Sequence, residues 1–222
     1  MATTAEVRRC TRLRGEPMRG RAAPECDSMS GTTNEGKEFM HYLSHYESSL
    51  GAMTMASDGE HLTGLWFDGQ KYDRSTIDDD AVLQPRLPVF TQTAQWLDAY
   101  FEGADPGFTP PISIEGSDFR KMVTSIMLSI PFGATSTYAR IAAEVARRTG
   151  RKQMSAQAVG GAVGHNPITL IVPCHRVLAS DGSLRGYAGG VDRKERLLEM
   201  EGVNMSGLST PPAADDGGGR RE

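Results

Sequence analysis

The chain has 222 residues, of which 38% are hydrophobic, and a formal net charge of −4 at pH 7. That length and apolar content can bury one sizeable core or two small ones. No run approaches the ~20 apolar residues of a membrane-spanning helix, and the N-terminus lacks an apolar signal core, so we expect no membrane partner and no secretion. Three cysteines, Cys10, Cys26 and Cys174, form an odd set that argues against a disulfide scaffold and for a reducing, cytoplasmic setting.

The charge is distributed unevenly along the chain. Residues 118–201 hold 12 Lys and Arg against 7 Asp and Glu, a net +5, which leaves −9 for the remainder. A basic half joined to an acidic half is typical of proteins that bind nucleic acid with one part, although charge alone also fits an ordinary solvated basic face.

Two polar segments flank the part of the chain that should fold. Residues 1–38 are rich in Arg, Glu, Gly, Thr and Ser, and residues 206–222 contain "PPAADDGGGRRE". Both compositions predict disordered tails, because they offer too little apolar surface to bury.

Residues 39–110 should form a small N-terminal lobe. In "GAMTMASDGEHLTGLWF", two apolar runs surround Asp58-Gly59, which predicts two strands joined by a turn. "VFTQTAQWLDAYFEG" then places Phe90, Ala94, Leu97 and Phe101 at helical spacing and stops at Gly103. The Pro- and Gly-rich stretch "ADPGFTPPISIEG" cannot be regular helix and predicts the linker to a second lobe at residues 111–205.

The second lobe begins with three predicted helices. "DFRKMVTSIMLSI" has an amphipathic period up to Pro131, and "TSTYARIAAEVARRTG" carries one apolar stripe up to Gly150. "SAQAVGGAVGHNP" is a slim helix of small residues that ends at Asn166-Pro167. The last two helices suggest a helix-turn-helix whose second member can approach a partner closely, although the pattern alone favours an ordinary helical hairpin.

Cys174 follows directly after an apolar run, in "ITLIVPCHRV". By itself a cysteine in that place is most often an inert core residue. Pro173 would fix its backbone, and His175 could receive or relay a proton, which favours a reactive thiol instead. Because consecutive side chains on an extended segment point in opposite directions, we expect His175 to act through an intervening water.

Five motifs resemble the O6-alkylguanine-DNA alkyltransferases, which are also called methylated-DNA–protein-cysteine methyltransferases. They are "IPFGATSTYARIAAEVA", "AQAVGGAVGHNP", "IVPCHRV", "GYAGG" and "RKERLLEMEG", and they occur in the order of that family. The resemblance implies an α+β fold with a small N-terminal α/β lobe, whose sheet is ribonuclease H-like, before a mainly helical C-terminal DNA-binding domain with a helix-turn-helix and the active-site cysteine. It also implies a methylated-DNA–protein-cysteine S-methyltransferase that rotates an alkylated guanine out of double-stranded DNA and accepts its alkyl group once, as a monomer without a cofactor.

The resemblance assigns catalytic roles by motif. Cys174 is the alkyl acceptor, His175 passes a proton between a water and the carboxylate of Glu201, and Asn166 braces the turn that carries the cysteine. Tyr138 donates toward the leaving guanine. Without the resemblance, Glu201 would be taken for a surface acid at a helix end, and Tyr138 for a core residue of its helix stripe.

The resemblance also assigns substrate contacts. The guanine pocket would be lined by Val177, Tyr187 and Ala188, with Arg176 close by. Ser155, Ala156 and Gln157 would begin a recognition helix that lies in the minor groove of DNA, where sequence readout is poor.

Two departures from the family pattern concern the DNA-intercalating residue and a metal. Many members carry an arginine where this chain has Gln157, so the usual means of filling the stack after base flipping is altered. Some relatives hold zinc in the N-terminal lobe, but here Cys10, Cys26, His41 and His45 lack a ligand spacing, and we expect no structural metal.

Two other functions compete with repair. A damage sensor would flip lesions without transferring anything, but in that group the cysteine is replaced, whereas Cys174 is present. A cysteine hydrolase would need an oxyanion hole and turnover, and no motif supplies a second, distant base.

Overall fold

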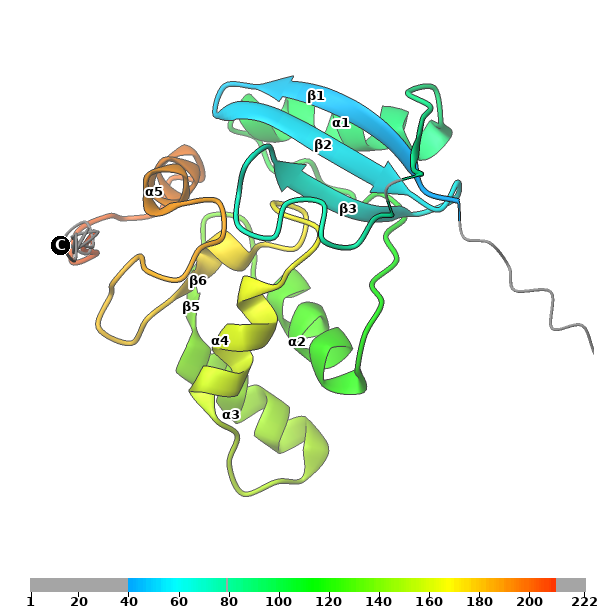
Figure 1. Cartoon of the computed structure of the whole chain (residues 1–222). Helices are drawn as coiled ribbons and strands as arrows, with labels where there is room; N and C mark the ends of the chain where they lie inside the picture. Colours follow the sequence, from blue (N-terminus) through cyan, green and yellow to red (C-terminus); the bar gives the residue numbers. More distant parts are fainter. Residues whose placement is uncertain (1–39, 79, 211–222) are drawn as a thin grey trace, which may run out of the picture. The chain divides into compact units, whose positions relative to one another are not determined.

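The computed structural model describes residues 40–78 and 80–210 (Figure 1). The predicted N-terminal tail and most of the predicted C-terminal tail therefore lie outside the described residues. The chain continues in a fixed conformation beyond position 206, because Ser209 bridges Ser183 and Leu208 packs against Leu184 and Leu198. Residues 206–210 are therefore part of the folded structure and not of the predicted disordered tail.

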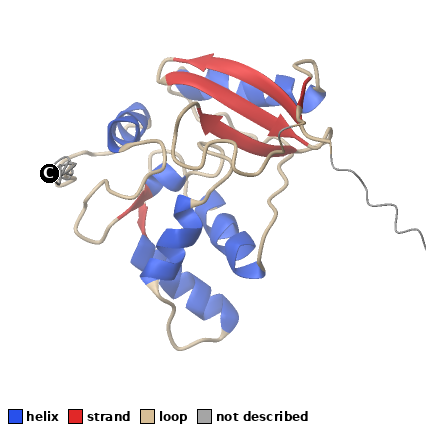
Figure 2. Ribbon diagram, viewed as in Figure 1, coloured by secondary structure: helices blue, strands red, loops and turns tan. Residues whose placement is uncertain are grey.

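A four-stranded sheet forms the N-terminal part (Figure 2). Strands β1 (Tyr42–Ser48), β2 (Gly51–Ser57) and β3 (Leu62–Phe67) run antiparallel, and β4 (Val82–Leu83) pairs parallel with β1. The predicted turn at Asp58-Gly59 is confirmed, because the Asp58 carboxylate accepts from the N–H groups of Glu60 and His61 at 2.9 and 2.7 Å.

Helix α1 (Pro88–Phe101) lies behind the sheet in the view of Figure 1. Pro88 stands in the first turn of the helix, where a main-chain N–H has no helix carbonyl to donate to, so the missing proline N–H costs no hydrogen bond. Its fixed φ also suits the start of a helix. The buried side chains are Val89, Phe90, Thr93, Trp96, Leu97 and Tyr100. The apolar stripe is therefore rotated from the predicted one, so that Tyr100 is fully buried, whereas Phe101 is half-buried and packs against the core.

The C-terminal part contains the three predicted helices, α2 (Asp118–Leu128), α3 (Tyr138–Thr149) and α4 (Ala156–Gly164). At the N-terminus of each helix, a side-chain hydroxyl accepts a hydrogen bond from a main-chain N–H. These hydroxyls belong to Ser117, Thr137 and Ser155, in the order of the helices. Gly150 ends α3 in the left-handed conformation, at a φ of 67° that favours glycine.

The segments that hold the cysteine are short. A 3₁₀ turn covers Cys174–Arg176, and β6 (Val177–Leu178) pairs parallel with β5 (Ser136–Thr137) directly before α3. Helix α5 (Val191–Met200) then returns the chain to the site.

One hydrophobic core crosses the predicted boundary between the lobes. Side chains of β2, β3 and α1 belong to the same buried cluster as those of α2, α3, α4 and α5. The predicted linker contributes as well, because the Leu62 N–H donates to the Pro111 carbonyl and the Ser113 N–H donates to the Leu62 carbonyl along the edge of β3. Among the helices of residues 40–78 and 80–210, none combines the length and apolar character needed to cross a membrane.

Candidate active site

Asn166 organises the turn that presents Cys174. Its carbonyl oxygen accepts from the Ile168 N–H at 3.1 Å, and its amide nitrogen lies 2.8 Å from the Val172 carbonyl oxygen and 3.1 Å from the Cys174 sulfur. A single side chain thus joins the two ends of the loop to the thiol.

The Cys174 thiol is free and only 5% exposed. Burial raises its pKa above the ordinary value, while the Asn166 hydrogen bond, the positive charge of Lys194 and the N–H groups of Cys174 and His175 act in the opposite direction. The resting sulfur is therefore a protonated thiol that needs a base before it can react.

Glu201 directly follows α5 and lies at the centre of a buried network of polar side chains. It is 5% exposed, so the interpretation as a surface acid is wrong. Its Oε1 accepts from Tyr100 Oη at 2.7 Å and lies 2.6 Å from His175 Nε2, and its Oε2 accepts from the Gly133 N–H at 3.1 Å. Burial opposes ionisation, but the hydrogen bonds from His175 and Arg176 and the charge of Arg176 outweigh it and lower the pKa of Glu201 to about 2.

His175 is fully buried beside that carboxylate. Because an ionised carboxylate only accepts, Nε2 must carry the proton of the 2.6 Å hydrogen bond, which leaves Nδ1 as an acceptor. Nδ1 has no hydrogen-bond partner among the described residues. Burial lowers the pKa of His175 despite the opposing effect of Glu201, so the ring is neutral at pH 7 and can accept a proton.

The guanidinium of Arg176, which was expected close to the substrate, is directed toward Glu201 and Ile130. It is 8% exposed, its Nε and Nη2 donate to Glu201 at 2.8 and 3.0 Å, and its Nη1 donates to the Ile130 carbonyl at 2.7 Å. Three of its five N–H groups therefore donate inside the protein, two of them to Glu201 as a bidentate pair.

Two phenols lie close to the sulfur. Tyr138 begins α3, and burial first, then proximity to Cys174, raises its pKa to about 12. Its hydroxyl approaches the loop so closely that a Cβ at Gly186 would lie 2.7 Å from it, so position 186 requires glycine. Tyr187 is buried, its pKa is raised well above the ordinary value by burial, and its hydroxyl has no hydrogen-bond partner among the described residues.

The open surface beside these phenols is formed by the glycine face of α4. A hollow of about 800 Å³ is lined by Tyr138, Gln157, Gly160, Gly161 and Gly186, among others. A neighbouring hollow of about 310 Å³ shares the three glycines and adds Tyr187 and Ala188. The structure thus brings these predicted contacts to one surface, while Val177 is buried beneath it.

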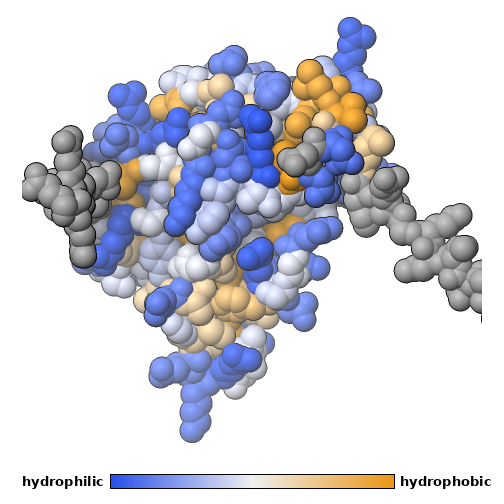
Figure 3. Space-filling view, in the orientation of Figure 1, coloured by the Kyte–Doolittle hydropathy of each residue, from blue (hydrophilic) through white to orange (hydrophobic). Residues whose placement is uncertain are grey.

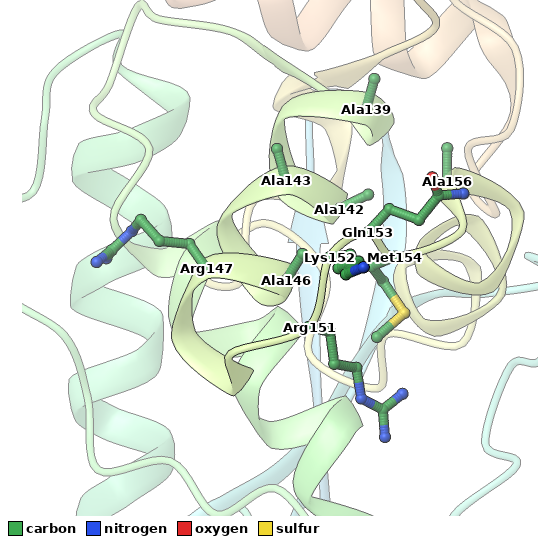
Figure 4. Close-up of a pocket in the computed structure, with 10 residues that line it drawn as sticks. All are labelled: Ala139, Ala142, Ala143, Ala146, Arg147, Arg151, Lys152, Gln153, Met154 and Ala156. Carbon is green, nitrogen blue, oxygen red and sulfur yellow. The ribbon is translucent and has the colours of Figure 1, made fainter.

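The helix-turn-helix has a small-residue groove with basic side chains at its rim (Figure 4). Ala139, Ala142, Ala143 and Ala146 line it from α3, with Ala156 opposite, and Arg147 and Arg151 extend away from it. Ser155 caps α4. Figure 3 shows pale and orange atoms over the lower part of the molecule, where Figure 1 places α4, with blue side chains around them.

Two residues of the site, Tyr100 and Lys194, were not predicted from the sequence. Tyr100 lies in the N-terminal lobe, with no sequence signal to connect it to Glu201. Lys194 is fully buried, its Nζ donates to the Val177 carbonyl at 2.6 Å, and burial lowers its pKa to about 8. A signal for Lys194 existed, because it shares a helical stripe with Val191, Leu197 and Glu201.

Cys10 and Cys26, which were considered as metal ligands in the sequence analysis, lie outside the described residues. Within residues 40–78 and 80–210, no three His, Cys, Asp or Glu side chains gather in a way that could hold a metal ion.

The fold and the site together define a class of protein with a helix-turn-helix and a buried cysteine next to a histidine–carboxylate pair. Two family models match the chain. The model "6-O-methylguanine DNA methyltransferase, ribonuclease-like domain" matches residues 41–114, and the model "6-O-methylguanine DNA methyltransferase, DNA binding domain" matches residues 118–203. The chain belongs to the 6-O-methylguanine DNA methyltransferase family.

Relatives and solved structures agree with that assignment. Methylated-DNA–protein-cysteine methyltransferases of Mycobacterium bovis and Methanosarcina barkeri are 38% and 39% identical, over 73% and 74% of this chain and 92% and 99% of their own. The Mycobacterium tuberculosis OGT in complex with DNA matches with a TM-score of 0.63 at 37% identity, over 72% of this chain and 92% of its own. The O6-methylguanine DNA methyltransferase of Methanococcus jannaschii matches with a TM-score of 0.52 at 29% identity, over 76% and 96% of the two chains.

Proposed function

We propose that the protein repairs DNA by direct reversal, with Cys174 accepting the alkyl group from O6 of an alkylated guanine in double-stranded DNA. A sulfur–carbon bond forms, the carbon–O6 bond breaks, and each molecule reacts once because the thioether is stable. The family membership and the buried thiol beside the His175–Glu201 pair carry this proposal.

Proton transfer precedes the attack. The thiol is neutral at rest, so its proton must leave before the sulfur attacks. His175 Nδ1 is the acceptor, through one water, and the ionised Glu201 stabilises the imidazolium that forms. The charge of Lys194 favours the thiolate.

Tyr138 assists the departure of guanine. As the carbon–O6 bond breaks, negative charge develops on the base, and a protonated phenol next to the sulfur can donate to it. Its pKa of about 12 keeps the phenol protonated at pH 7. The base reaches this place by rotating out of the stack.

DNA is bound through α3 and α4, with α4 in the minor groove. The glycines of α4 allow close approach of its backbone, and the side chains at the N-terminus of α4 contact the strands, with Gln157 at the position of the flipped base. Arg151 and Lys152 in the connector supply phosphate contacts. The lobe of residues 39–110 supports the site, and we propose that a monomer acts in the reducing cytoplasm.

DNA with a labelled methyl group on O6 of guanine separates this function from the alternatives. Repair predicts label on a Cys174 peptide, in an amount equal to the protein and absent from Cys174→Ala, which still binds DNA. Tight binding without label would indicate a damage sensor, and repeated turnover of an ester or amide would indicate a hydrolase.

A further inference from the structure

Tyr100 brings a hydroxyl from the N-terminal lobe into the proton-transfer network. It lies in the last turn of α1 and is fully buried. Its Oη is 2.7 Å from Glu201 Oε1 and 3.2 Å from His175 Nε2. Its ring is held by Trp96, stacked at 5.1 Å between centroids, and by the edge contact with Phe132 at 6.0 Å. The phenol therefore has little freedom to turn away.

The directions of the hydrogen bonds follow from the acceptor. Glu201 is ionised and can only accept, so both Tyr100 O–H and His175 Nε2–H donate to Oε1, where Arg176 Nη2 also donates at 3.0 Å. The Tyr100 proton remains in place, because burial raises its pKa well above the ordinary value. The hydroxyl thus fixes the very oxygen that holds the histidine in its reactive tautomer.

We propose that Tyr100 is a positioning residue for alkyl transfer, whose hydroxyl holds Glu201 in line with His175 so that the N-terminal lobe completes the proton relay. This inference rests on the proposed function. The chemistry occurs in the C-terminal part, whereas one of the donors that orient it comes from a helix 101 residues earlier in the chain.

Other charged or titratable groups also face His175. Arg176 and Lys194 lower its pKa, Glu201 raises it, the Tyr187 ring lies 6.4 Å away between centroids, and Cys174 is its neighbour in the chain. Tyr100→Phe leaves all of these in place. With one donor fewer, Oε1 becomes a stronger acceptor for the imidazole proton, so the pKa of His175 rises.

The test compares Tyr100→Phe with Tyr46→Phe. Tyr46 offers a matched control, because its hydroxyl lies in the same lobe, is exposed and donates to Asp98 at 2.8 Å, whereas the Tyr100 hydroxyl is buried and donates to Glu201. For single-turnover methyl transfer from O6-methylguanine DNA, we expect Tyr100→Phe to be about tenfold slower, the effect of one hydrogen bond to a charged group. The acid limb of its rate–pH profile should move up by about half a unit. DNA affinity should stay unchanged, and Tyr46→Phe should match the unaltered protein in rate and profile.

A second variant links the effect to Glu201. If Tyr100 acts through that carboxylate, adding Tyr100→Phe to Glu201→Gln should slow transfer less than adding it to the unaltered protein. Equal slowing in both backgrounds, or a rate loss without a pH shift, would overturn the inference while leaving the proposed function intact. Absence of transfer by the unaltered protein would instead remove the proposed function.

Discussion

At the scale of single residues, the protonation states in the site depend on how many hydrogen-bond donors replace water around each group that folding buries. Glu201 leaves water but gains donors from Tyr100, His175, Arg176 and Gly133, and it remains ionised. Cys174 also leaves water, gains fewer donors, and has a raised pKa. The two opposite outcomes suit the two proposed roles, since a stable anion can hold His175 while a protonated thiol stays unreactive until His175 takes its proton.

Replacing Tyr138 tests the proposed proton donor. Tyr138→Phe keeps the ring against its neighbours but removes the hydroxyl that is proposed to donate to the departing base. General acids typically contribute at least ~100-fold to a rate, so single-turnover transfer should slow on that order while the DNA dissociation constant changes little. An unaltered rate would exclude Tyr138 from this role.

The position of Arg176 shows what sequence motifs leave open. The order of the motifs indicated Cys174, His175, Glu201 and Asn166, and the structure places them together. It could not indicate which way the guanidinium of Arg176 turns, because its neighbours Glu201 and Ile130 come from distant segments. Tyr100 was missed for the same reason, since its partner is set by tertiary packing.

At the scale of elements, the long periodic segments were the predictable ones. Helices α2, α3 and α4 begin and end close to the predicted residues, because hydroxyl caps and glycines mark their ends. Strand β1 was missed, since "YLSHYES" buries Ser44 and exposes His45, so its polar residues give no clear alternation. Strand β4 has two residues and depends entirely on pairing with β1.

In helix α4, Gln157 stands where many family members carry arginine, and substitutions test what this position does. Gln157→Arg adds a charge at the N-terminus of the recognition helix, so the slope of log affinity against log salt should steepen by about one phosphate contact. If this position fills the stack, transfer from duplex DNA should also become faster. Gln153→Arg adds the same charge in the connector and should change only the salt slope. Equal transfer rates for the two variants would contradict a stacking role for position 157.

At the scale of the whole molecule, a continuous core and the buried network join the parts that the sequence divides. The same cluster includes Leu65 of the sheet, Val123 of α2 and Leu197 of α5. Glu201 contacts α1, the loop before β5, and the 3₁₀ turn. Stability and activity should therefore respond together to protonation of this network.

Acid should destabilise the protein in a defined pH range. The pKa of Glu201 is about 2 when folded, against an ordinary value of 4.5, so its contribution to stability is complete above pH 4.5 and is lost as the pH falls toward 2. The lowered pKa of His175 acts in the same direction, beginning below its ordinary value of 6.5. Urea unfolding followed by circular dichroism across this range measures the loss.

Glu201→Gln provides the comparison for that measurement. It leaves the buried Arg176 charge without its partner, so unfolding free energy at pH 7 should fall by about 3–5 kcal/mol. Below pH 4.5 the variant should lose less further stability than the unaltered protein. Parallel pH curves for the two proteins would show that Glu201 is not the group that titrates.

Mass spectrometry of the protein after reaction with excess O6-methylguanine duplex is the most direct measurement. We expect each molecule to gain one methyl group, located by peptide mapping on Cys174 and absent from Cys10 and Cys26, and the DNA to regain unmodified guanine in equal amount. An unmodified Cys174 after the lesion has been repaired, or more than one guanine restored per protein molecule, would contradict transfer to this sulfur.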